Sequence, residues 1–145
     1  MKLPADFKDL LRLLDEHCVE YAIVGGYAVA RHGQPRFTGD LDILVGTDEA
    51  NAGRLLKALD GFGFGQLDLE VSDFTQAGCI VQLGVPPLRI DLLTSIDGVD
   101  AGDAIRRRIC DRDEELSLYF ISRDDLIANK SATGRAQDVA DLENL

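Results

Sequence analysis

Residues 24–45 read VGGYAVARHGQPRFTGDLDILV, and this stretch sets two adjacent glycines after one apolar run and two aspartates at the start of the next. The apolar runs are short and rich in Val, Ile and Leu, which is typical of buried β-strands. Strands are depleted in aspartate, so local propensity does not account for Asp40 and Asp42. The stretch therefore predicts a strand, a helix that begins at Gly25 and Gly26, and a second strand whose two like charges need another explanation.

The rest of the chain predicts one α/β domain. Its 145 residues are enough to enclose a hydrophobic core. The expected strands are 21–26, 40–45, 116–121, and a hairpin of 79–83 and 88–93 joined through 84–87. The expected helices are 6–18, 27–32, one that runs to residue 59, 99–109, 124–132 and 137–145. Asp6 is the expected N-cap of the first, and Ser122 caps the helix 124–132. Thr47 or Asp48 caps the helix that runs to residue 59, and Gly61, Gly63 and Gly65 end it. We expect a short mixed β-sheet with helices mainly on one face, in a single domain spanning 1–145 whose C-terminal helices begin near residue 122.

The charge balance argues against nucleic acid as a direct partner. The chain has 26 acidic and 15 basic residues and a net charge of −11, whereas nucleic-acid binding draws its energy largely from Lys and Arg at phosphates. Residues 106–108 are the one basic cluster, and consecutive helical residues point around the axis, so a solvated helix end is favoured over a nucleic-acid patch. A small anionic ligand chelated to a cation is compatible with this field, because a bound metal reverses the local charge.

The sequence also predicts where the protein resides. It contains no run of eighteen apolar residues, and its N-terminal sequence carries charges where a signal peptide needs an apolar segment. Cys18, Cys79 and Cys110 are odd in number and widely spaced, which is typical of reduced thiols. We therefore expect a cytoplasmic protein with no membrane partner.

Asp40 and Asp42 point to the same side of their strand, because side chains alternate along a strand. Their Cα atoms are then roughly 6.5 Å apart, and two full charges at that distance repel by about 2.5 kcal/mol at an effective dielectric constant near 20. The repulsion disappears if one carboxyl is protonated, or is offset if a divalent cation lies between them. Taken alone, the pair fits exposed strand-end aspartates slightly better than a metal site.

Asp91 changes this balance. It interrupts the apolar strand LRIDLLT, where a buried carboxylate is costly without a partner. That partner is either Arg89, two residues back on the same side, or a cation shared with Asp40 and Asp42 if the two acidic strands lie side by side.

Gly25 and Gly26 supply a second feature of the same site. Glycines at a strand-to-helix junction let backbone N–H groups face outward, and the first amides of a helix attract phosphate. A tight turn is the alternative explanation for a Gly-Gly pair. An acidic strand thirteen residues beyond makes the pattern more specific, because it sets an anion site opposite a cation site.

Together, Gly25-Gly26, Asp40-Leu-Asp42 and Asp91 resemble the motif of the polymerase-β-type nucleotidyltransferase superfamily. The resemblance spans residues 21–94. More narrowly, GGYAVARHG, RFTGDLDILV and LIANKSATGRAQDVADLENL are similar to small bacterial nucleotidyltransferase-like proteins related to the abortive-infection and toxin–antitoxin group.

The resemblance implies a metal-dependent transfer of a nucleoside monophosphate from an NTP to an acceptor, with release of pyrophosphate. Asp40, Asp42 and Asp91 would be the catalytic residues and would hold two Mg²⁺ ions, or Mn²⁺ in their place. The nucleotide-binding residues would be Gly25, Gly26, Arg36, Thr38 and Lys130. Lys130 has an alternative role, since a lysine at a helix C-terminus also meets the helix dipole.

Two matters stay open at this stage. The acceptor has no assignment, although the acidic charge favours a small molecule or a protein over nucleic acid. The second hypothesis for the whole chain is a non-catalytic nucleotide-binding or interaction module, such as a toxin–antitoxin component with a protein partner.

Overall fold

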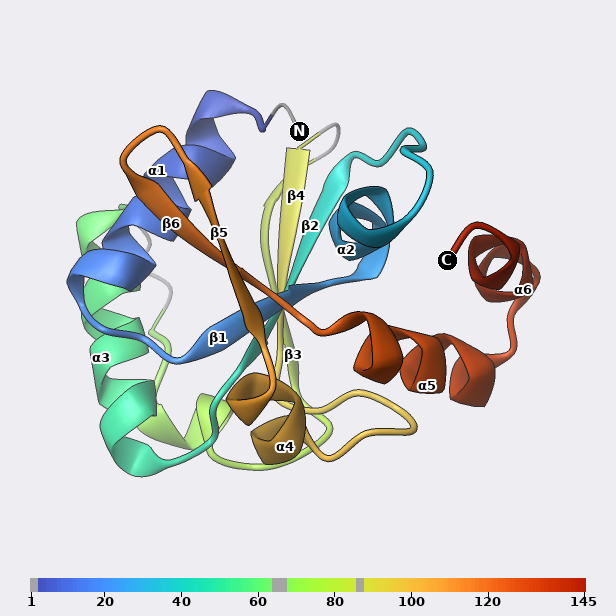
Figure 1. Ribbon diagram of the computed structural model, residues 1–145. Coiled ribbons are helices and arrows are strands. Elements are labelled where there is room, and N and C mark those ends of the chain that lie inside the picture. Colours follow the sequence, from blue (N-terminus) through green and yellow to red (C-terminus); the bar gives the residue numbers. More distant parts are fainter. Residues whose placement is uncertain (1–2, 64–67, 86–87) are drawn as a thin grey trace.

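The structure is a computed structural model, and it describes residues 3–63, 68–85 and 88–145. Its centre is a six-stranded mixed sheet in the order β3-β4-β2-β1-β6-β5 (Figure 1). Neighbouring strands are antiparallel except for the pairs β2–β4 and β1–β6, which are parallel. The strands are β1 Tyr21–Val24, β2 Asp40–Val45, β3 Ile80–Val85, β4 Leu88–Leu93, β5 Ile109–Asp113 and β6 Leu116–Phe120.

Helices surround this sheet, and the predicted α/β class with a mixed sheet is confirmed. Asp48 and Ser122 cap α3 and α5, since each side chain accepts a hydrogen bond from the backbone N–H three residues later. The helices are α1 Ala5–Glu16, α2 Gly25–His32, α3 Glu49–Gly61, α4 Ala101–Arg106, α5 Arg123–Thr133 and α6 Ala136–Glu143, with a 3-10 helix η2 at Val71–Phe74.

Two local predictions were wrong. Asp6 is not the N-cap of α1, because the helix starts directly after Pro4, whose fixed φ suits that position. The helix expected over 99–109 is shorter, and 109–113 form the edge strand β5. Gly65 and the prolines at 86 and 87 lie outside the described residues.

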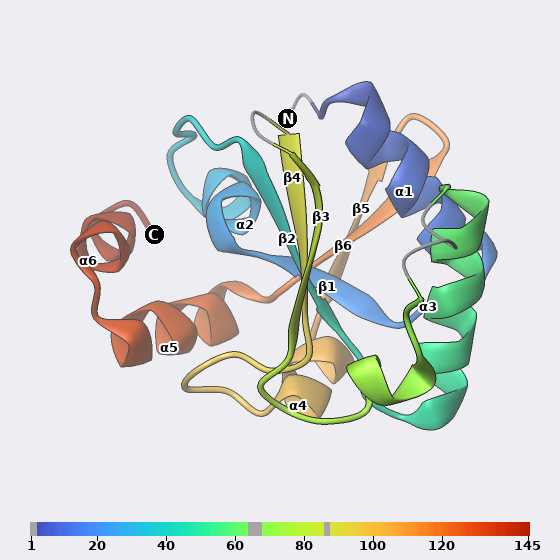
Figure 2. The same ribbon diagram turned by 180° about the vertical axis from the view of Figure 1, so that it is seen from behind.

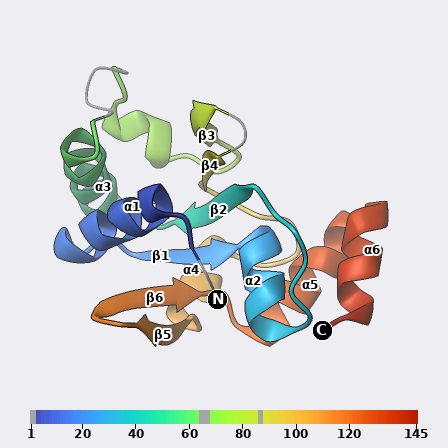
Figure 3. The same cartoon turned by 90° about the horizontal axis from the view of Figure 1, so that it is seen from above.

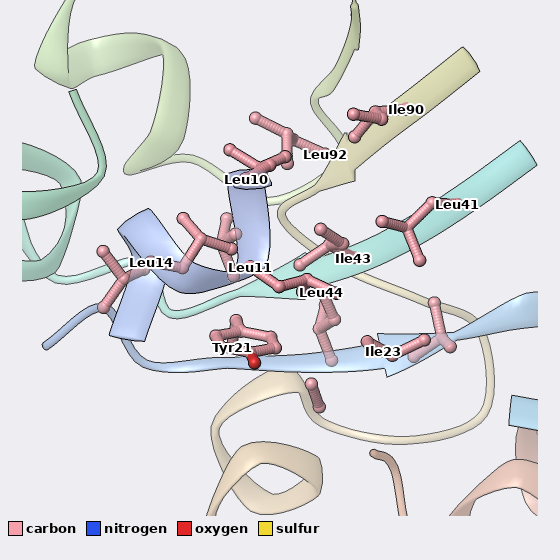
Figure 4. Packing of buried hydrophobic residues seen from close by; sticks show 14 of the residues in the cluster. Leu10, Leu11, Leu14, Tyr21, Ile23, Leu41, Ile43, Leu44, Ile90 and Leu92 are labelled. Carbon is pink, nitrogen blue, oxygen red and sulfur yellow. The ribbon is translucent and has the colours of Figure 1, made fainter. Parts of the chain in front are cut away.

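The hydrophobic core lies between the sheet and α1 with α3. Leu10, Leu11 and Leu14 of α1 are fully buried at helical spacing, and Figure 4 shows them packed over the strands that carry Tyr21 and Ile43. Because side chains alternate, this apolar face of β2 leaves Asp40 and Asp42 on the other face.

Helices α5 and α6 lie on the opposite side of the molecule from α1 and α3, next to α2, in all three orientations (Figures 1, 2 and 3). The carboxylate face of the sheet therefore meets α5 and the start of α2 rather than the main core. Across the described ranges, every helix is too short or too polar to cross a lipid bilayer.

Candidate functional site

The register of β2 and β4 brings the acidic residues together. Asp42 is directly opposite Asp91, and Asp40 is opposite Arg89, in a parallel pairing. Residues opposite one another in adjacent strands point to the same face, so all four side chains share the face away from the main core. The expectation that Asp91 joins the side of Asp40 and Asp42 agrees with this register.

Arg89 is the cation of this group. Its Nη2 donates to Asp40 Oδ2 at 2.9 Å, and its Nε lies 3.4 Å from Asp91 Oδ1. Nε and Asp91 Oδ1 are both buried, and neither has a hydrogen-bond partner among the described residues, so this second contact is an ion pair without hydrogen-bond geometry. We call Asp40, Asp42, Arg89 and Asp91 the carboxylate cluster.

Asp42 has the most perturbed carboxyl of the carboxylate cluster. Burial, followed by the nearby charges of Asp91 and Asp40, raises its pKa from 3.8 to about 6, and Lys130 opposes this rise. A cluster of three carboxylates with one guanidinium leaves at least one negative charge poorly compensated. Protonation of Asp42 or a bound cation relieves that repulsion.

The start of α2 packs directly against this cluster. Gly25 has a φ of +67°, and a Cβ there would lie 3.1 Å from Asp42 Cγ and still closer to Oδ2. A Cβ on Gly26 would lie 2.7 Å from Thr38 Oγ1. Only glycine allows the helix N-terminus to approach both the acidic strand and the loop before it.

Gly25→Ala is expected to lower the free energy of unfolding by about 2–3 kcal/mol and to displace Asp42, because the new methyl adds a clash to the cost of a left-handed backbone. Gly134→Ala is the matched control, since Gly134 has a φ of +64° and a methyl group there would meet no atom of the described residues within 4 Å. The control should lose only about 1–2 kcal/mol. Chemical denaturation of both variants measures the difference. An equal loss in the free energy of unfolding for both would mean that Asp42 moves away from the new methyl group at no cost.

A cleft of about 610 Å³ opens beside the carboxylate cluster. Asp40 and Asp42 line it together with Gly25, Gly26, Arg36, Thr38 and Lys130, so seven of the eight sequence-predicted site residues face one space. Asp91, beside Asp42, is buried and does not line the cleft. Apolar and polar side chains complete the cleft. The remaining lining residues are Val24, Ile80, Leu93, Ser95, Ile96, Asp97, Asn129, Thr133, Arg135, Gln137 and Asp138.

The predicted phosphate ligands Arg36 and Lys130 are ion-paired with α6. Arg36 makes a two-pronged pair with Asp141 at 2.8 and 3.1 Å. Lys130 is 5% exposed, and its Nζ lies 3.0 Å from Asp138 and 3.1 Å from Asp141. Lys130 is thus a buried ion-pair partner and not simply a helix-end lysine.

Asp138 is the centre of this second group. Burial alone would raise its pKa, but hydrogen bonds from Arg135, Thr133 and Lys130 hold the pKa well below its usual range. Sequence reasoning did not single out Asp141. The available signal was its spacing of three residues from Asp138 on a helix, which sets both carboxylates on one face.

The carboxylate cluster is not a preformed cage of three metal ligands. Among the residues that the structure describes, no three His, Cys, Asp or Glu side chains form a group that could hold a metal ion. Asp40 and Asp91 instead contact the guanidinium of Arg89, at 2.9 and 3.4 Å. Asp42 and Asp91 remain as an adjacent pair.

Comparison with known proteins places the fold. No protein-family model matches the chain, and no curated protein matches its sequence. A candidate nucleotidyltransferase from Thermotoga maritima superposes with a TM-score of 0.61 at 16% identity, over 94% of this chain and 88% of that one. An antigenic nucleotidyltransferase-like protein from Paracoccidioides brasiliensis superposes with a TM-score of 0.51 at 20% identity, over 97% of this chain and 76% of that one. The chain therefore has the fold of these nucleotidyltransferase-like structures.

Proposed function

We propose that the protein transfers a nucleoside monophosphate from an NTP to a hydroxyl group of an acceptor. The observation that carries this proposal is the pairing of β2 with β4, which sets Asp42 beside Asp91 while the N-terminus of α2 packs against Asp42. The carboxylate pair would bind a cation and the helix N-terminus would bind an anion. Because the two are in contact, one Mg-NTP complex could occupy both sites.

The residues of the carboxylate cluster fit a divalent cation. Asp91 Oδ1 is buried and has no hydrogen-bond partner in the described part of the chain, and burial followed by the charges of Asp91 and Asp40 raises the pKa of Asp42. Mg²⁺ commonly uses only one or two carboxylates and takes its other ligands from water and substrate phosphates. Asp42 and Asp91 would hold it first, with Asp40 as a further ligand, and when bound there Mg²⁺ or Mn²⁺ supplies charge neutralisation at the reacting phosphate.

The chain's own groups would bind and orient the nucleotide. The amides at Gly25 and Gly26 would donate to the phosphate tail, since the first N–H groups of a helix have no partner within the helix. Thr38 Oγ1, next to Gly26, donates to the backbone oxygen of Asp40 at 3.3 Å and would turn from it to donate to the same phosphates. Arg36 and Lys130 would contribute positive potential, although Asp138 and Asp141 already compensate most of it.

In the reaction, the acceptor oxygen forms a bond to the α-phosphorus while the bond from that phosphorus to the bridging oxygen of the β-phosphate breaks. Pyrophosphate leaves with the bonding electrons. The acceptor's proton would pass to Asp40, a partly exposed carboxylate that lines the cleft. The acidic net charge of −11 favours a small molecule or a protein as acceptor.

Calorimetry with Mg-ATP, Mg-GTP, Mg-CTP and Mg-UTP tests nucleotide binding, and mass spectrometry of cell lysate treated with labelled NTP then tests transfer. Asp97→Asn is a suitable control, because Asp97 lines the same cleft but is exposed and outside the carboxylate cluster. We expect binding and a labelled product for the wild type and for this control. Absence of binding to all four nucleotides would refute the proposal.

One observation favours the second candidate, a non-catalytic nucleotide-binding or interaction module. Both cations expected at the phosphates are already paired with α6, which weakens the attraction for a triphosphate. Under that alternative, nucleotide binds but no labelled product forms in lysate at any nucleotide concentration.

A further inference from the structure

Arg89 differs from two other arginines that pair with aspartate in this protein. Arg36 with Asp141, and Arg107 with Asp125, form two hydrogen bonds each, at distances between 2.8 and 3.1 Å. Such two-pronged pairs use the planar guanidinium fully. Arg89 instead makes a single hydrogen bond to Asp40 and a contact of 3.4 Å to Asp91 without hydrogen-bond geometry.

Arg89 and Asp91 therefore form an ion pair that lacks hydrogen-bond geometry, at a partly buried position. Arg89 Nε and Asp91 Oδ1 are buried and, as far as the described residues extend, unsatisfied at the same time. A buried polar atom without a partner costs free energy that an optimised structural pair avoids. The guanidinium therefore neutralises the carboxylate cluster without being well bound by it.

The position of Arg89 indicates what its guanidinium does in the carboxylate cluster. Arg89 lies opposite Asp40 and two residues before Asp91 on the same face, so it sits among the carboxylates to which a divalent cation would bind. Two cations at one site repel each other, and two carboxylates that hold Arg89 are less available as ligands. Cation binding and the present position of Arg89 are then mutually exclusive.

We propose that Arg89 is a built-in counter-ion of the carboxylate cluster, which a divalent cation displaces when it binds. This inference rests on the cation-binding part of the proposed function. With Arg89 in place, the cluster keeps its strands paired in the absence of metal. Once released, Asp40 turns from Arg89 to the cation, and the guanidinium becomes free at the edge of the cleft.

The test compares Mn²⁺ affinity, measured from the electron paramagnetic resonance signal of free Mn²⁺, between the wild type and Arg89→Gln. We expect Arg89→Gln to bind Mn²⁺ at least about tenfold more tightly, because the competing charge is gone. Arg112→Gln controls for net charge, since Arg112 is exposed on β5 at the far edge of the sheet from β4 and its loss changes the total charge equally. This control should change the affinity less than about twofold.

A second measurement does not depend on the stability of the glutamine variant. In the wild type, Mg²⁺ titration should shift the ¹⁵N resonance of Arg89 Nε and speed its hydrogen exchange, and Arg89→Lys identifies that resonance by its absence. An Arg89 with a purely structural role would keep its resonance unchanged while Mg²⁺ binds.

The outcomes separate the two proposals. If the wild type binds Mn²⁺ but Arg89→Gln binds it equally or more weakly, the counter-ion role of Arg89 is wrong and the cation site stands. If neither protein binds Mn²⁺, the cation site itself is wrong, and with it the proposed metal-dependent transfer.

Discussion

Asp138→Asn is expected to lower the free energy of unfolding by about 3–5 kcal/mol, the usual cost of removing one partner from a buried ion pair. Asp138 is 1% exposed and accepts from Lys130, Thr133 and Arg135. The amide group of asparagine turns one acceptor into a donor, so at least one of these three groups loses its hydrogen bond to residue 138. Urea denaturation followed by circular dichroism measures the loss.

Glu143→Gln provides the matched control for this variant. Glu143 is exposed on the same helix and loses the same unit of charge, so its free energy of unfolding should change by less than about 0.5 kcal/mol. Hydrogen exchange of the α6 amides then shows whether the destabilisation is local. A loss below about 1 kcal/mol in Asp138→Asn would mean that water replaces the carboxylate without strain.

Asp42→Asn is expected to change activity and stability in opposite directions. Nucleotidyl transfer should fall by about a thousandfold, because the proposed cation loses a principal ligand. In metal-free buffer at pH 7.5 the fold should instead gain up to about 3 kcal/mol, since the asparagine places no charge in this buried position next to Asp40 and Asp91. Label transfer and urea denaturation provide the two measurements.

The pH dependence of stability follows from the raised pKa. The pKa of Asp42 is 3.8 in the unfolded reference and about 6 in the fold, so the folded protein holds this proton more tightly. The resulting stability is fully present below about pH 4 and is lost as the pH rises through about 6. Asp42→Asn should remove this decline between pH 4 and pH 6.5.

Asp97→Asn, in the same cleft but exposed, should keep the wild-type pH profile. If Asp42→Asn is less stable than the wild type in metal-free buffer, then Asp42 accepts hydrogen bonds that hold the fold together. A structural role would then replace the ligand role for this residue.

The sequence allowed most of the central sheet to be predicted, because short runs rich in Val, Ile and Leu and the alternation of side chains along a strand are local signals. The bounds of β2 and β4 agree with the runs expected at 40–45 and 88–93. The side of the sheet that Asp42 occupies follows from the same alternation. The carboxylate cluster was therefore accessible from the sequence once the two strands were assumed to pair.

Strand β5 was missed for a physical reason. Its sequence ICDRD alternates half-buried and exposed positions at the edge of the sheet, with charged residues at three of five positions. An edge strand needs little apolar surface, so its pattern resembles the end of the preceding helix. Tertiary pairing with β6 decides its conformation.

The ion pairs of the cations in the cleft could not be predicted from the local sequence. Arg36 and Lys130 carry the residue types expected at a phosphate site, and the cleft includes both. Their pairing with Asp141 and Asp138 depends on how α6 packs against α5. Sequence periodicity reports which face a residue occupies but not which distant residue meets it.

The pair between Arg36 and Asp141 has a consequence for biosynthesis. The two residues are 105 positions apart, and at roughly 5–20 residues per second about 5–20 s separate their emergence during translation. Until α6 is complete, a nascent chain exposes Arg36 and Lys130 without counter-charges next to a sheet that is already able to pair. The formation of α6 therefore sets the moment at which the cleft acquires its final electrostatic character.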